Sequence, residues 1–209
     1  RWSEKYTKTD MVYLASGGFW SVFGQLSASI IAFSLAIVMA RYVPKDAYGS
    51  YKYVLAIVAI LSAFSLGGLG TAVFQSVAHG YRSALSQGFR ANLQWSSLVF
   101  FGAFAGGGYY LMSGNIELGV GILIGGCISP FLSGFNLYLS LFLGEKDFKS
   151  VAWYGEVLTN LIPAIVIATI AVLAPKPLFL LSAYFVSNTA AAAYSYWRAT
   201  QRYPDTLKT

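Results

Sequence analysis

Residues 53–66 read YVLAIVAILSAFSL, and this stretch decides the fold class because it is apolar on every face. A strand of a membrane barrel alternates apolar and polar residues over about ten positions, and no such alternation occurs. Backbone polar groups in lipid must be paired within the protein, so a stretch of this kind is typical of a helix among lipid and other helices. The sequence therefore predicts a membrane-spanning α-helix at this point.

Further stretches of the same character lie on both sides of it. Each is bounded by charged residues and approaches or exceeds the roughly 20 mostly apolar residues that a helix needs to cross a bilayer. We therefore predict an all-α, polytopic membrane helix bundle of about six transmembrane helices. The predicted spans are 14–41, 50–76, 90–112, 117–143, 150–174 and 177–198. Residues 14–198 would form one transmembrane lobe, with a cytoplasmic segment at 1–13 and a cytoplasmic tail or linker at 199–209.

The composition excludes an ordinary soluble domain and gives no support to an enzyme. Charged residues make up 11% of the chain, against about 25% in soluble domains, and the mean hydropathy is +0.59. One His and one Cys (Cys127) cannot form a metal-ligand cluster or a disulfide framework. The glycines at 67, 68 and 70 are followed by no P-loop lysine, and no paired carboxylates have a catalytic spacing. We expect no enzymatic activity, no cofactor and no metal.

The distribution of Lys and Arg predicts the orientation in the membrane. If the N-terminus is cytoplasmic, the outside carries only four of these residues, Arg41, Lys45, Lys52 and Lys176. The inside carries ten: Arg1, Lys5, Lys8, Arg82, Arg90, Lys146, Lys149, Arg198, Arg202 and Lys208. This follows the positive-inside rule, so both termini are predicted to be cytoplasmic. The net charge of +6 is then explained by topology and by membrane lipids as partners, with no nucleic acid required.

Charges around the first hairpin are candidates for function. Arg41, Lys45 and Lys52, together with Asp46, lie on the side that should be poor in cations. Their side chains could extend to the outer lipid headgroups. Alternatively, they could face a cavity that attracts an anionic substrate such as a lipid-linked pyrophosphate.

Glu156 is a second candidate, because it lies about 9 Å of helical rise into the fifth span. An ionisable group at such a depth is a functional candidate by default. A purely structural ion pair with Arg90 or Lys149 is the competing interpretation. The polar residues within spans could line a cavity or join helices; they are Gln25, Asn92, Gln94, Asn136, Asn160 and Asn188.

Small residues and prolines have two interpretations each. The GxxxG spacings Gly102–Gly106 and Gly121–Gly125 could form a dimer face or ordinary packing inside one bundle. Pro130 and Pro163 should kink the fourth and fifth spans, either as static bends or as part of a rocking transporter.

Three short motifs resemble those of polysaccharide and oligosaccharide flippases, members of the multidrug/oligosaccharidyl-lipid/polysaccharide exporter superfamily. Residues 40–51 (ARYVPKDAYGSY) are similar to the first-hairpin signature. Residues 66–72 (LGGLGTA) are similar to the Gly-rich end of the second span, and residues 142–149 (FLGEKDFK) to the loop between the fourth and fifth spans. With the spacing of the spans, the resemblance covers nearly the whole chain.

The resemblance implies a function. Such proteins move lipid-linked sugars from the cytoplasmic to the outer leaflet of the bacterial inner membrane, by ion-driven alternating access between two helical lobes. Carried over by position, Arg41, Lys45 and Lys52, with Arg90, would bind the anionic lipid-linked glycan. Glu156 would be the candidate for ion coupling, although no family motif matches there.

The chain is similar only to the N-terminal lobe of such a flippase. One lobe forms one wall of a central cavity, so transport would require a second lobe from the same chain, a homodimer or another subunit. The alternative function is a flippase-like structural or assembly subunit of a larger membrane complex.

Overall fold

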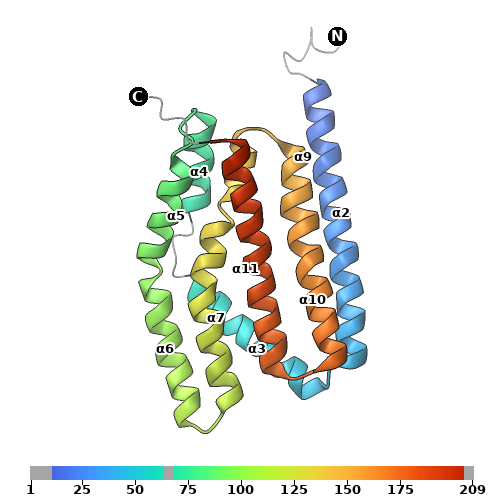
Figure 1. Cartoon of the computed structure of the whole chain (residues 1–209), viewed down its shortest axis with the longest axis vertical. Coiled ribbons are helices and arrows are strands. Elements are labelled where there is room, and N and C mark those ends of the chain that lie inside the picture. The colour runs from blue at the N-terminus through green and yellow to red at the C-terminus, as the bar shows by residue number, and fades with distance from the viewer. Residues whose placement is uncertain (1–10, 64–67, 205–209) are drawn as a thin grey trace.

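The computed structural model describes residues 11–63 and 68–204, and side chains from residue 16 onward. Every regular element in these ranges is helical, which confirms the all-α class (Figure 1). The elements, in chain order, are α2 (Met11–Tyr42), α3 (Lys45–Ser62), α4 (Leu69–Ala78), α5 (Ala84–Trp95), α6 (Ser97–Met112), α7 (Ile116–Phe135), α8 (Tyr138–Gly144), α9 (Phe148–Ser150), the π-helical η1 (Val151–Leu158), α10 (Thr159–Leu173) and α11 (Pro177–Arg202).

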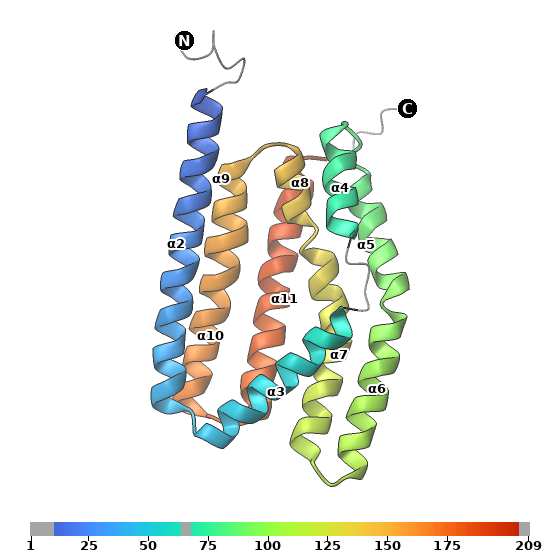
Figure 2. The same cartoon turned by 180° about the vertical axis from the view of Figure 1, so that it is seen from behind.

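The predicted spans coincide with these helices, but only the first and last are single helices. The second is divided between α3 and α4, the third between α5 and α6, the fourth between α7 and α8, and the fifth among α9, η1 and α10. Most helices run along the long axis of the bundle, while α3 crosses it obliquely (Figure 2). The start of α2 and the end of α11 lie at the same end (Figure 1).

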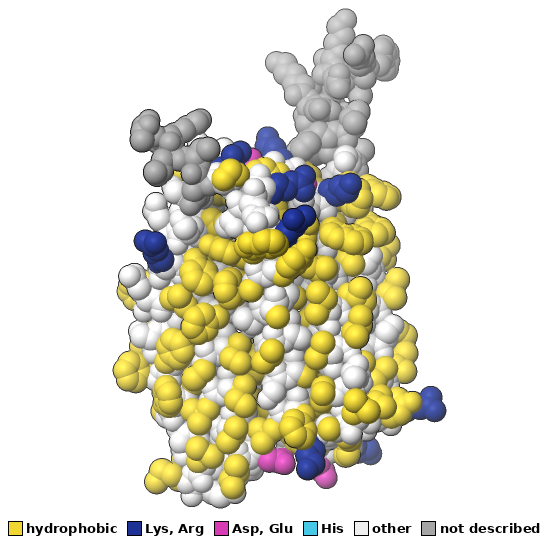
Figure 3. Space-filling view, viewed as in Figure 1, with side chains coloured by type: hydrophobic (Ala, Val, Ile, Leu, Met, Phe, Trp, Pro, Cys, Tyr) yellow, Lys and Arg dark blue, Asp and Glu magenta, His cyan; other side chains and the backbone are white. Residues whose placement is uncertain are grey.

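Three segments of the described chain are long and apolar enough to cross a membrane by themselves. They are Ser16–Tyr42, Ile116–Gly144 and Phe148–Leu173. On the face that Figure 3 shows, hydrophobic side chains are spread over the middle, and Lys and Arg side chains concentrate toward the two ends. This is the surface of a helical membrane protein. The number of crossings and the side of the termini stay predictions.

Local sequence determines where the helices turn. Pro44 follows α2 with φ −57° and ψ 146°, an extended conformation that ends one helix before the next begins at Lys45. At the α6–α7 turn, Gly114 adopts φ +82°, which only glycine adopts at low cost. The Asn115 side chain then accepts a hydrogen bond from the Leu118 backbone N–H at 3.3 Å and caps α7. Pro177 occupies the first turn of α11, where its missing N–H is not needed.

Helix α7 is at the centre of the packing. A Cβ at Gly125 would lie 2.6 Å from Val58 of α3 and 2.7 Å from Phe185 of α11. A Cβ at Gly121 would approach Leu181 to 2.8 Å. The Gly121–Gly125 pair therefore lets neighbouring helices of the same bundle approach closely, and the packing interpretation of this motif is confirmed. Gly102 of α6 likewise faces α3, where a Cβ added to this glycine would lie 2.6 Å from the Leu61 side chain.

Candidate functional site

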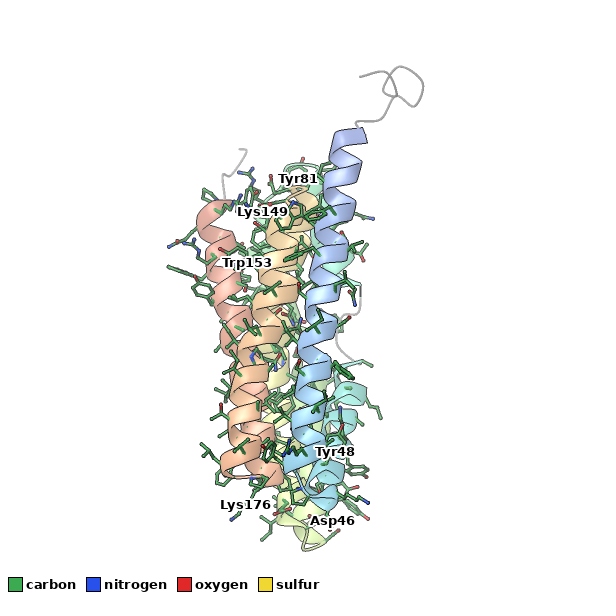
Figure 4. All side chains as sticks on the ribbon, turned by 90° about the vertical axis from the view of Figure 1, so that its right-hand side faces the viewer. Asp46, Tyr48, Tyr81, Lys149, Trp153 and Lys176 are labelled. Carbon is green, nitrogen blue, oxygen red and sulfur yellow. The ribbon has the colours of Figure 1, made fainter. Side chains whose placement is uncertain are left out.

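The three cations of the first hairpin are gathered at one end of the bundle. Arg41 lies in the last turn of α2, Lys45 begins α3, and Lys52 follows two turns later. All three are exposed. Lys176, in the connection between α10 and α11, lies at the same end, as do Asp46 and Tyr48 (Figure 4). The hairpin therefore presents a cationic surface. Both interpretations of the sequence require this: contact with the outer lipid headgroups, and attraction of an anionic substrate.

Two tyrosine rings lie next to the ammonium group of Lys52. Its Nζ lies 5.6 Å from the ring centroid of Tyr48 and 6.0 Å from that of Tyr51, within the range of a cation–π interaction. Tyr51 is only 5% exposed, and its ring contacts that of Tyr184 on α11 edge to face, with centroids 6.2 Å apart. A row of tyrosines therefore leads from the exposed cation into the bundle.

Tyr184 opens onto a partly polar pocket of about 330 Å³ between α3, α7 and α11. Its polar lining consists of Ser62, Ser129, Ser133, Asn136 and Tyr184. The Ser129 hydroxyl is buried and has no hydrogen-bond partner among the described residues. A buried hydroxyl without a partner is costly, so Ser129 is an unsatisfied polar group in the wall of the pocket. We name the pocket and the Tyr184–Tyr51–Lys52 row the tyrosine path.

Most of the tyrosine path is not visible in the sequence. Asn136 is among the polar residues predicted to lie within spans, but no sequence pattern marks the serines or Tyr184. Uncharged residues spread over three helices give no local motif. Only the packing of α3, α7 and α11 brings them together.

The structure places Arg90 and Glu156 away from the hairpin. Arg90 is exposed on α5, and Glu156 is half-buried in η1; both elements lie toward the opposite end of the bundle (Figure 1). The Cγ of Glu156 packs against Gly24 of α2, 3.0 Å from where a Cβ would stand. Within the described part of the chain, Glu156 forms no ion pair with Arg90 or Lys149. The alternative interpretation, a structural ion pair of Glu156 with Arg90 or Lys149, is therefore wrong.

The other polar residues within spans have varied roles. Asn92 is 4% exposed, and its Nδ2 donates to the Pro130 carbonyl oxygen at 2.8 Å, which joins α5 to α7. Asn160 and Asn188 instead donate to carbonyl oxygens one turn earlier in their own helices. Gln25 and Gln94 are exposed.

The end opposite the hairpin holds a network of ion pairs. Arg82 binds Glu145 through two hydrogen bonds of 2.6 and 3.1 Å. Asp147 accepts from the Tyr203 hydroxyl at 3.0 Å and pairs with Arg202 at 3.2 Å. We name these five residues the ionic cluster. It joins the α4–α5 connection, the α8–α9 loop and the end of α11.

Burial raises the pKa of the Tyr203 hydroxyl, and the hydrogen bond to Asp147 raises it further. Tyr203 therefore stays protonated near neutral pH and keeps donating to Asp147. Over the ranges 11–63 and 68–204, no three His, Cys, Asp or Glu residues are grouped so as to hold a metal ion.

The fold and the charge distribution define a helical membrane protein with a cationic hairpin and a partly polar pocket between α3, α7 and α11. The profile of the polysaccharide biosynthesis protein family matches residues 14–209. The chain belongs to this family, which confirms the resemblance drawn from the three motifs. No curated protein matches the chain, and no solved structure matches it.

Proposed function

We propose that the chain is one lobe of a flippase that moves a lipid-linked oligosaccharide across the bacterial inner membrane by alternating access. Membership of the polysaccharide biosynthesis family supports this proposal. The observation that carries it is the tyrosine path, because it connects the exposed Lys52 with a partly polar pocket between α3, α7 and α11. Transport by such a lobe involves no covalent chemistry, so we propose no enzymatic role.

The chemistry of the path fits the two parts of this substrate. Arg41, Lys45 and Lys52 would attract the anionic pyrophosphate, which Lys and Arg bind through charge-assisted hydrogen bonds. Serine hydroxyls, the Asn136 amide and tyrosine rings would contact the sugar, because such pockets combine apolar walls with a few polar groups. The pocket volume of about 330 Å³ is at the lower end for small-molecule sites.

Glu156 and Arg90 would have different roles in transport. Glu156 is a half-buried carboxylate without an ion pair among the described residues, which suits a group that binds and releases a proton or cation during transport. Arg90 would add positive charge for the glycan at the other end of the lobe. A second lobe is required to close the cavity, from the same chain, a second copy or another subunit.

Neutralising the hairpin tests the proposal. In the triple variant Arg41→Gln/Lys45→Gln/Lys52→Gln we expect loss of surface polysaccharide with normal membrane insertion, because the anionic headgroup loses all three of the hairpin cations that would attract it. The matched control is Lys176→Gln, which removes an exposed cation at the same end (Figure 4) and should leave export unchanged. Export is measured as surface polysaccharide per cell, and insertion as protein in the membrane fraction.

Normal export in the triple variant would contradict the flippase proposal. If the protein then also purified with unrelated membrane subunits in fixed stoichiometry, the alternative of a structural or assembly subunit would take its place.

A further inference from the structure

A second pocket lies outside the tyrosine path, at the end of the bundle that holds the ionic cluster. We call this end, opposite the hairpin, the basic end. It has a volume of about 230 Å³ and is lined by Phe142 of α8, Tyr154 of η1, and Arg198, Gln201 and Arg202 of α11. Arg198 and Arg202 are one helical turn apart, so both guanidinium groups serve the same face of α11. The lining is thus part aromatic and part cationic.

The charge of this pocket is not balanced by the protein. Arg202 pairs with Asp147 at 3.2 Å and donates to the Ser150 hydroxyl at 2.9 Å. Arg198 is exposed and lies beside the Tyr154 hydroxyl, but it pairs with no carboxylate in the described part of the chain. One positive charge in the pocket therefore lacks an acidic counterpart.

The surroundings of the pocket are those of a membrane surface. Trp153 and Trp197, each next to a pocket residue in sequence, are 51% exposed, and Trp153 and Lys149 lie toward the same end (Figure 4). Exposed tryptophans of membrane proteins favour the depth of the lipid headgroups. A basic pocket between helices at that depth is a typical site for an anionic headgroup.

We infer that this pocket binds the phosphate headgroup of an anionic glycerophospholipid, with Arg198 as the main anion-binding residue. Arg202, already oriented by Asp147 and Ser150, has N–H groups left to donate, since a guanidinium carries five. The Tyr154 hydroxyl and Gln201 can donate to headgroup oxygens. The inference does not depend on transport, because it concerns a resident lipid at the opposite end from the hairpin.

The test is a lipid titration of the purified protein in mild detergent. The probes are phosphatidylglycerol, phosphatidylcholine and inorganic phosphate, and the readouts are the shift in Tm and lipid retention in native mass spectrometry. We expect phosphatidylglycerol alone to raise Tm. In Arg198→Gln its apparent Kd should rise about fivefold, as expected for one basic residue near an anionic lipid, and Arg198→Lys should retain part of the affinity.

Lys149→Gln is the matched control. Lys149 is an exposed cation at the same end, but its Nζ lies 5.7 Å from the Trp20 ring on the α2 side and does not line the pocket. Its loss should leave the Kd unchanged. Equal weakening in Lys149→Gln and Arg198→Gln would overturn the site in favour of general surface attraction.

Other results also overturn the inference. An unchanged Kd in Arg198→Gln would exclude the pocket, and equal binding of phosphatidylcholine would exclude charge recognition. Protection by inorganic phosphate that is lost in Arg198→Gln would replace the lipid with a free phosphate. None of these outcomes bears on export, so the failure of this inference is distinct from failure of the flippase proposal.

Discussion

At the scale of single residues, Asp147 organises the basic end. It caps α9 by accepting from the Ser150 N–H at 3.1 Å and the Ser150 hydroxyl at 2.8 Å, and it holds Tyr203 and Arg202 of the last helix. Its side chain is only 12% exposed. A carboxylate with this many donors contributes more than an exposed ion pair.

We expect Asp147→Ala to lower the free energy of unfolding by about 2 kcal/mol, because several charge-assisted hydrogen bonds are lost together. Glu117→Ala is the control, since Glu117 is an exposed carboxylate in the first turn of α7 and should cost no more than about 1 kcal/mol. Thermal unfolding in detergent, followed by tryptophan fluorescence, measures both. Equal losses would show that Asp147 acts only as a helix cap.

At the scale of helices, close approach of α6 and α7 depends on glycine. A Cβ at Gly126 of α7 would overlap the Cβ of Ala103 on α6, which is fully buried. Neither group is the end of a flexible side chain, so the helices themselves would have to separate. Gly108, also in α6, has nothing within 4 Å of its Cβ position.

Gly126→Ala should therefore lower stability by about 1–3 kcal/mol, the usual cost of overpacking. Gly108→Ala should be neutral or stabilise by up to about 1 kcal/mol, because alanine has the higher helix propensity. Tm of the two variants in the same detergent provides the comparison. If both variants had the wild-type Tm, the tight α6–α7 contact would be contradicted.

The helices were largely predictable from charge spacing, whereas their interruptions were not. Charge-free stretches predict the spans, because charged side chains are costly in lipid. The absence of charge does not, however, predict where the helix within a span is interrupted. Thus the division of the third span at Ser96 and the π-helical turn around Glu156 were missed. Most of the tyrosine path was missed for a similar reason. Ser129 and Tyr184 are recognised as parts of one site only because the folded chain brings them to the same pocket.

At the scale of the whole molecule, the two ends differ in how their charges are used. At the basic end, Arg82 and Arg202 are neutralised by Glu145 and Asp147. At the hairpin end, no described ion pair involves Arg41, Lys45 or Lys52. Exposed apolar side chains such as Phe33 and Phe101 cover the surface between the ends. Among the described residues, ion pairs join helices only at the end opposite the hairpin, and the hairpin cations, like Arg198, stay able to bind a ligand.

The predicted orientation places the hairpin on the outer side of the membrane and the ionic cluster in the cytoplasm, and single cysteines can test it. Cys127, which is half-buried within α7, is first replaced by serine. Asp46→Cys and Lys149→Cys then mark opposite ends (Figure 4). In spheroplasts, an impermeant maleimide should label Asp46→Cys directly and Lys149→Cys only after permeabilisation, because ten of the fourteen Lys and Arg residues are predicted to be inside. The reverse pattern would invert the topology. The hairpin cations would then meet the substrate on the cytoplasmic side, as the first residues to bind it instead of the last to release it.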